Sequence, residues 1–226
     1  MLYAGIDLAG KSRLHKTCLA LIERRKGEWK GLPKGRLVSV YCGLQDEDIF
    51  KIVYESKPGV LSIDAPLSLP SNTWREVDIK IREILRKIHP PLIKWMLPPI
   101  KLRQMKILTE RGIHISETLE DKIEVIETHP RASFLFLFGE NLKKTLILYK
   151  KKEKTLKRDA LLELTLTLEC LIAGILHRIS DDDKLDATFS AYVSLLYKEN
   201  PEKVLILSTG ENTPPFVVPK PQTIEI

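Results

Sequence analysis

The sequence has little cysteine and few aromatic residues. Its 226 residues include three cysteines, which are far apart and odd in number. This pattern excludes a disulfide framework and a cysteine-rich metal site, and we predict that Cys18, Cys42 and Cys170 are buried thiols that pack as small apolar side chains. Aromatic residues make up 7% of the chain, and no set of them predicts a platform for stacking nucleic-acid bases.

Long apolar runs are also lacking. The longest apolar stretches, at residues 132–138 and 170–176, are too short to cross a bilayer. The N-terminal residues MLYAGIDLAG lack the basic start and long apolar run of a signal peptide. We therefore expect no membrane partner and, by default, a cytoplasmic location. Nothing in the sequence identifies a protein partner.

The overall composition indicates a globular protein with a basic surplus. Hydrophobic residues make up 43% and charged residues 29% of the chain, and we expect residues 1–226 to form one domain. The net charge is +6 and the isoelectric point is about 9.1. A positive surplus favours polyanionic partners such as RNA or DNA, because bound phosphates release their counterions. Abundant Lys, Glu and Ile with little Gln are typical of thermophile proteins.

The first part of the chain predicts three antiparallel strands, then a helix and a parallel strand. The strands are expected at residues 2–8, 15–22, 37–41 and 60–64. A turn-rich stretch at 26–35 joins the second strand to the third, and Asp46 is a plausible N-cap for a helix at 46–56. This order is typical of α/β folds with a mixed sheet.

The second part predicts a helical insertion and then more α/β structure. Prolines punctuate residues 66–121, where helical patterns occupy about 73–88 and 100–111 and basic side chains dominate. The elements expected after it are a strand at 123–127, a helix beginning at Pro130, helices at 155–176 and 183–197, and a terminal hairpin of 204–207 and 216–218 across residues 210–212.

Three of the predicted strands each carry an acid where the apolar run stops. These acids are Asp7, Asp64 and Glu127. An ionised carboxylate inside a buried strand costs several kcal/mol unless it is paired or coordinated. One such acid needs no special explanation, but three of them indicate a shared cation.

A fourth acid comes from the helix predicted at 183–197. Asp183 and Asp186 are three positions apart and share one helical face. Ala187 and Ala191 keep the side chains on the packing face of this helix small, so the helix can approach a sheet closely. We predict that Asp186, which faces inward beside Ala187, binds metal. Two preceding acids are expected mainly to cap the helix: Asp181 and Asp182.

Several other polar residues have both a functional and a structural interpretation. His129, two positions beyond Glu127, could bond a carboxylate, move protons or contact phosphate, or could simply end a strand. Lys11 and Arg13 could contact phosphate or lie in a solvated turn. Arg75 and Asp78 are one helical turn apart, so they could contact substrate or form an ion pair within a helix.

These motifs together resemble a known family. The matching segments are Gly5-Ile6-Asp7, Ile63-Asp64-Ala65-Pro66-Leu67, Arg75-x-x-Asp78, Glu127-x-His129-Pro130 and Asp183-x-x-Asp186-Ala187. The family is domain of unknown function 429, regarded as predicted nucleases with an RNase H-like fold. The resemblance covers about residues 2–220, and the order of the motifs makes it specific.

The resemblance implies a fold and a set of site residues. The expected fold is an RNase H-like mixed five-stranded sheet, with three antiparallel strands followed by parallel strands, flanked by helices. Asp7, Asp64 and Glu127 correspond to the acids of the first, fourth and fifth strands, and Asp186 or Asp183 to the acid of the final helix. A basic segment of the family matches only in part here, where it includes Lys150 and Arg158, which are expected to bind substrate.

The leading hypothesis is a metal-dependent nuclease that uses Mg²⁺ or Mn²⁺, because these ions prefer oxygen ligands. Two ions roughly 3.5–4 Å apart would be held by the acids, with Asp7 as the bridge. One alternative is an ATP-dependent phosphotransferase of the actin-like ATPase or sugar kinase type. Such enzymes need glycine-rich phosphate loops, whereas this chain has just 11 glycines, and the turn after Asp7 offers only Gly10. Another is a non-catalytic nucleic-acid-binding protein with a structural ion.

Overall fold

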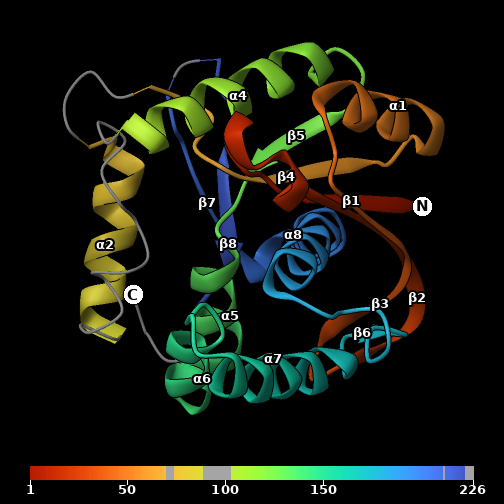
Figure 1. The fold of residues 1–226 in the computed structure, drawn as a ribbon, viewed down its shortest axis with the longest axis vertical. Helices are drawn as coiled ribbons and strands as arrows, with labels where there is room; N and C mark the ends of the chain where they lie inside the picture. The colour runs from red at the N-terminus through yellow and green to blue at the C-terminus, as the bar shows by residue number, and fades with distance from the viewer. Residues whose placement is uncertain (70–73, 89–102, 211, 222–226) are drawn as a thin grey trace.

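A mixed sheet runs through the computed structural model of this chain (Figure 1). The structure describes residues 1–69, 74–88, 103–210 and 212–221. Within these residues the sheet has eight strands, in the order β6-β3-β2-β1-β4-β5-β8-β7. Their bounds are β1 Leu2–Asp7, β2 Cys18–Trp29, β3 Leu32–Cys42, β4 Val60–Asp64, β5 Glu124–Glu127, β6 Ile172–Ala173, β7 Val204–Leu207 and β8 Phe216–Pro219.

The five central strands have the arrangement that the sequence predicted. β1 pairs antiparallel with β2, and β2 pairs antiparallel with β3. β4 runs parallel to β1, and β5 runs parallel to β4. The predicted α/β fold with an RNase H-like mixed sheet is therefore confirmed. The hairpin of β7 and β8 is also confirmed, although Glu211 in its turn lies outside the described residues. The parallel pairing of β8 with β5, which joins this hairpin to the sheet, was not predicted.

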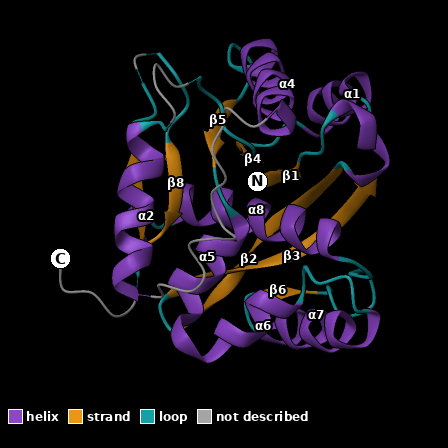
Figure 2. Ribbon diagram, turned by 60° about the vertical axis from the view of Figure 1, so that its left-hand side comes forward, coloured by secondary structure: helices purple, strands orange, loops and turns teal. Residues whose placement is uncertain are grey.

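Helices lie on both faces of the sheet (Figure 2). The described α-helices are α1 Asp46–Ser56, α2 Glu76–Ile88, α4 Arg103–Leu119, α5 Pro130–Phe138, α6 Lys143–Leu148, α7 Lys154–Glu169 and α8 Asp182–Glu199. Short 3-10 helices are η1 Lys11–Lys16, η3 Gly139–Leu142 and η4 Pro201–Lys203. None of the helices formed by the described residues combines the length and the apolar character needed to cross a membrane.

Several predicted elements have different bounds in the structure. The turn-rich stretch expected at 26–35 is mostly strand, because β2 extends to Trp29 and β3 begins at Leu32. The helix expected at about 100–111 continues to Leu119 as α4. The strand expected at 15–22 begins at Cys18, because residues 11–16 form η1 and the Thr17 N–H closes that turn on the Leu14 carbonyl. The helix expected at 155–176 ends at Glu169. Its carboxylate accepts the backbone N–H groups of Gly174 and Ile175, and Gly174 has a φ of +82°, which an α-helix excludes.

The core is divided into two apolar layers, one on each face of the sheet. On one face α8 packs with α5, α6 and α7, and on the other face α1 and α4 pack (Figure 1). Side chains alternate between these layers along β1: Tyr3 belongs to the α8 layer, whereas Ala4 and Ile6 belong to the α1 and α4 layer. By the same alternation, Asp7 leaves β1 on the α8 side.

The approach of α8 to the sheet is close, as the alanines of this helix predicted. A Cβ atom added to Gly5 would lie 2.0 Å from the Ala191 backbone nitrogen and 2.5 Å from the Ala187 carbonyl oxygen. The Ser62 hydroxyl on β4 donates a 2.5 Å hydrogen bond to the Ser190 carbonyl oxygen. Glycine at position 5 is therefore required for the backbone of α8 to reach the sheet beside Asp7.

The prediction of three buried thiols is wrong. Cys18 and Cys42 form a disulfide, and Cys170 is an exposed free thiol just after α7. The two bridged cysteines are register partners of β2 and β3, so the antiparallel pairing places residues 24 positions apart side by side. Spacing along the sequence does not reveal such a pair, because the length of the hairpin decides which residues face each other.

Candidate metal centre

Three of the predicted acids meet at one end of the sheet. Asp7 and Asp64 are register partners on the parallel strands β1 and β4, so both carboxylates leave the sheet on the same side. Asp186 reaches them from the first turns of α8 and is 1% exposed. One oxygen from each of the three carboxylates lies within 4.8 Å of the others. The sequence prediction that distant acids become neighbours holds for these three.

Burial and mutual repulsion raise the pKa values of the cluster. Burial, followed by the charge of Asp186, raises the pKa of Asp64 to about 8. Burial also raises the pKa of Asp7 well above its ordinary value, although Lys150 opposes this rise. The pKa of Asp186 is raised overall, because burial raises it more than the charge of Lys150 lowers it. Three acids that resist ionisation together form a site that an additional cation would stabilise.

Lys150 lies beside this cluster. Its Nζ is 2.5 Å from Oδ2 of Asp186 and 3.4 Å from Oδ2 of Asp182, and its side chain is 29% exposed. The Tyr149 hydroxyl donates a 3.2 Å hydrogen bond to the other oxygen of Asp186. Lys157 pairs with Asp182 at 2.5 Å. The sequence singled out Lys150, but it gave no sign that Tyr149 and Lys157 lie here.

The other acids at the start of α8 also have polar partners. Asp181 accepts the Lys184 backbone N–H at 2.9 Å, which confirms its predicted role as the N-cap. Asp183 lies 3.5 Å from the Lys16 ammonium group, so the turn after β1 contacts the start of α8. Burial raises the pKa of Asp182, but Lys150 and Lys157 more than offset it, so its net pKa is lowered.

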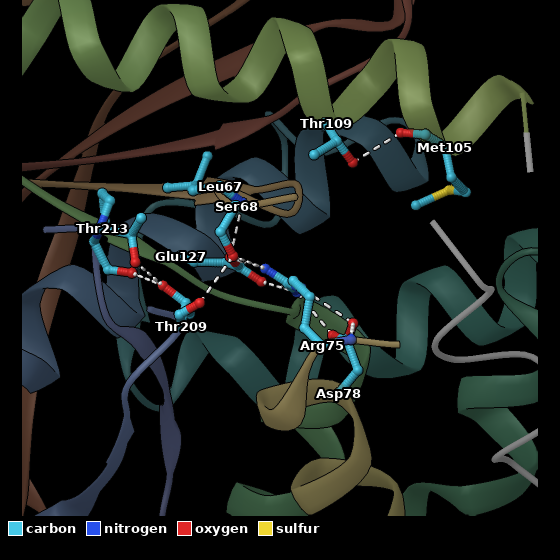
Figure 3. Close-up of polar contacts among 10 residues, drawn as sticks. Leu67, Ser68, Arg75, Asp78, Met105, Thr109, Glu127, Thr209 and Thr213 are labelled. Carbon is cyan, nitrogen blue, oxygen red and sulfur yellow. Dashed lines mark hydrogen bonds and ion pairs between the residues drawn. The ribbon is translucent and has the colours of Figure 1, made fainter. Parts of the chain in front are cut away.

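Glu127 is not brought into the cluster. It is the register partner of Ile63, whose side chain belongs to the α1 and α4 layer, so Glu127 leaves the sheet on the face opposite to Asp64. There its carboxylate accepts two hydrogen bonds from the Arg75 guanidinium, at 2.6 and 2.7 Å, and one from the Leu67 backbone N–H at 2.8 Å (Figure 3).

Arg75 lies between two carboxylates. Figure 3 shows its guanidinium between Glu127 and Asp78, and the nearest pair of Arg75 and Asp78 atoms is 2.7 Å apart. Both residues are 5% exposed. The ion pair expected between Arg75 and Asp78 is therefore present. The larger network with Glu127 was not predicted, and all three of its charged side chains form part of the lining of a cleft.

His129 caps a helix at the edge of a cleft. It is the N-cap of α5, and its Nδ1 accepts the Ala132 backbone N–H at 3.2 Å. The cleft has a volume of about 220 Å³, and its lining includes Asp7, Asp64, Glu127 and His129. The structural interpretation of His129 at the end of β5 therefore applies, and the residue also faces the space beside the acids.

The remaining predicted substrate-binding side chains are exposed to solvent or belong to residues whose side chains the structure does not describe. Arg13 is exposed on η1. The side chain of Arg158 is 81% exposed on α7 and lies 3.5 Å from Asp159. The side chain of Lys11 lies outside the described residues.

The donor set fits a hard divalent cation. The three clustered ligands are all carboxylate oxygens, which suit Mg²⁺ or Mn²⁺ better than Zn²⁺. Their negative charge also exceeds the positive charge that Lys150 supplies. The arrangement can therefore hold a cation beside a cleft, where it would face a bound anion.

Comparisons with known proteins place the chain in a family. No curated protein sequence matches it. A solved structure of RuvC from Thermus thermophilus is similar, with 13% sequence identity and a TM-score of 0.44, over 95% of this chain and 99% of that one. The family model described as "Protein of unknown function (DUF429)" matches residues 5–201. Since that match spans most of the sequence, the chain belongs to the DUF429 family of proteins of unknown function.

Proposed function

We propose that this protein is a metal-dependent phosphodiester hydrolase that cleaves nucleic acid. The observation that carries the proposal is the meeting of Asp7, Asp64 and Asp186 within 4.8 Å of one another, next to a cleft. These three carboxylates would hold Mg²⁺ or Mn²⁺. A bound ion would supply positive charge that polarises the phosphate and stabilises the transition state of its hydrolysis.

The basic surplus of the chain supports an anionic substrate. The chain as a whole carries a net charge of +6. Such a surplus attracts the phosphate backbone of RNA or DNA with little regard to sequence, and the attraction weakens as salt is added.

The test compares the wild-type protein with an Asp7→Asn variant. We expect single- or double-stranded RNA or DNA to be cleaved with Mn²⁺ and to remain intact with EDTA. Asp7→Asn removes one charge from the proposed ligand set, so cleavage should be lost while the fold is kept. The control is Asp159→Asn, because Asp159 is an exposed acid paired with Arg158.

Two results would contradict the proposal. One is full cleavage by Asp7→Asn, because the cluster would then not be the active site. The other is the absence of any divalent-ion binding to the wild-type protein, measured by isothermal titration calorimetry.

A further inference from the structure

Lys150 contacts one acid of the cluster directly. The Nζ atom is 2.5 Å from Asp186, one of the three clustered acids, and 3.4 Å from Asp182. An ammonium group at such distances neutralises a carboxylate directly. In the described structure, the position beside Asp186 that a cation could take is therefore already held by a lysine.

The position of this lysine is set by rigid neighbours. Lys150 follows Tyr149, whose side chain is fully buried and whose hydroxyl donates to Asp186. The Tyr149 backbone N–H also bonds to the Thr145 carbonyl oxygen in α6, at 3.0 Å. The lysine stem begins from a fixed point, and Nζ lies 5.3 Å from the centre of the Tyr149 ring. The backbone of Lys150 is therefore held where its side chain can reach Asp186.

The charges of the cluster balance with a single ion. Asp183 and Asp182 have lysine partners of their own in Lys16 and Lys157. Three ionised carboxylates and the ammonium group of Lys150 leave two negative charges, which one divalent ion neutralises. A second divalent ion would make the cluster strongly positive, and it would be repelled by Nζ at short range.

We propose that Lys150 supplies the second positive charge of the site, so that the protein binds one divalent ion instead of the two that the sequence suggested. This inference rests on the proposed function. In the reaction, water adds to phosphorus and loses a proton, while the bond from phosphorus to one bridging oxygen breaks and that oxygen gains a proton. Lys150 neutralises the charge that accumulates on the phosphate oxygens, which makes it a catalytic residue that the ion does not replace.

The test counts Mn²⁺ ions on metal-free protein by isothermal titration calorimetry and native mass spectrometry. The wild-type protein should bind one ion. Lys150→Met frees an oxygen of Asp186, so this variant should bind its first ion at least about tenfold more tightly and take up a second. Lys150→Arg keeps the charge and should again bind one ion. Circular dichroism spectra and melting temperatures check that each variant is folded.

Lys157→Met is the matched control. Lys157 also pairs with Asp182, but it forms no ion pair with Asp186 among the described contacts. Its loss should leave one bound ion. At saturating Mn²⁺, we expect nucleic-acid cleavage to fall about 100-fold in Lys150→Met and to change little in Lys157→Met.

The outcomes separate this inference from the proposed function. Two ions on the wild-type protein would overturn the inference and leave the proposed function standing. Equal stoichiometry and affinity in wild type and Lys150→Met would also overturn it. No ion on the wild-type protein would overturn the proposed function itself. One ion on the wild type and two on Lys150→Met would support the inference even before any cleavage assay.

Discussion

Asp7 and Asp64 are register partners on adjacent parallel strands, and both carboxylates face the helix that carries Asp186. The cluster therefore depends on two separate features of the fold. The register of β1 against β4 brings two acids side by side. The short distance between the sheet and α8 brings the third, and Gly5 makes that distance possible.

We expect Gly5→Ala to destabilise the protein and disturb the cluster. The added Cβ would lie 2.0 Å from a backbone nitrogen of α8, so the helix must shift. Overpacking of this kind typically costs about 1–3 kcal/mol, and more when backbone must move. Urea unfolding measures the loss, and Mn²⁺ affinity should fall with it. Gly10→Ala is the control, since no atom lies within 4 Å of its added Cβ; equal effects of the two substitutions would contradict the close approach.

The metal-free protein should lose stability as the pH rises from about 4 to about 8. Burial, followed by the charge of Asp186, raises the pKa of Asp64 in the folded state to about 8, from 3.8. The folded state then holds a proton that the unfolded state has released, so the free energy of unfolding falls across this range. Asp7 and Asp186 are shifted in the same direction.

Urea midpoints between pH 5 and pH 8, measured in EDTA, check this dependence. Asp64→Asn should flatten the curve, because the variant has no proton to release at this position. With Mn²⁺ the affinity of the site should rise with pH, since the ion binds the ionised carboxylates and releases their protons. A metal-free protein whose stability increases over this range, in a way that Asp64→Asn leaves unchanged, would show that the cluster does not hold protons.

The Arg75 network is expected to stabilise the fold. Glu127→Gln removes one partner of a buried ion pair and leaves the Arg75 charge less compensated, which should cost about 3 kcal/mol. Glu124→Gln, on the same strand, removes an exposed pair with Lys198 and should cost about 1 kcal/mol or less. Urea unfolding compares the two. Because Glu127 lies outside the cluster, the number of bound Mn²⁺ ions should not change; loss of ion binding at unchanged stability would instead identify Glu127 as a ligand.

Reduction of the disulfide should destabilise the metal-free protein. Cys18 and Cys42 close a loop of 24 positions, for which the chain-entropy model gives roughly 3 kcal/mol. Urea unfolding with and without a phosphine reductant measures the difference. Cys170→Ser should leave both curves unchanged, because Cys170 is an exposed free thiol. Identical stability with and without reductant, despite full reduction shown by thiol titration, would contradict this prediction.

Glu127 shows why part of the candidate site could not be read from the sequence. Along β1 the buried residues alternate between the two layers, and this alternation fixes the face of the sheet to which Asp7 points. In β5 the residues before Glu127 are Val125 and Ile126, which are buried on opposite faces. With apolar side chains on both faces, the sequence holds no sign of the direction in which Glu127 points. The packed structure decides it, because Val125, two residues earlier, lies in the α1 and α4 layer and Glu127 pairs with Ile63 of the same layer.

The contact of Lys150 with Asp186 has a similar origin. The family resemblance singled out Lys150, but as a residue for the substrate. Its place depends on how α6 ends and on how Tyr149 is buried against the start of α8. Packing between segments 36 positions apart in the chain has no local signal, because periodicity describes one element at a time.

The sequence alone determined which segments become strands and helices in the central fold, that acids end β1 and β4, and that α8 is narrow enough to approach them. These properties follow from local patterns of apolar, small and charged side chains. The tertiary structure decided which acids share a face, which cysteines bond and which lysine enters the cluster. Those outcomes depend on strand register and on packing between distant segments, and a shift of one residue would reverse them.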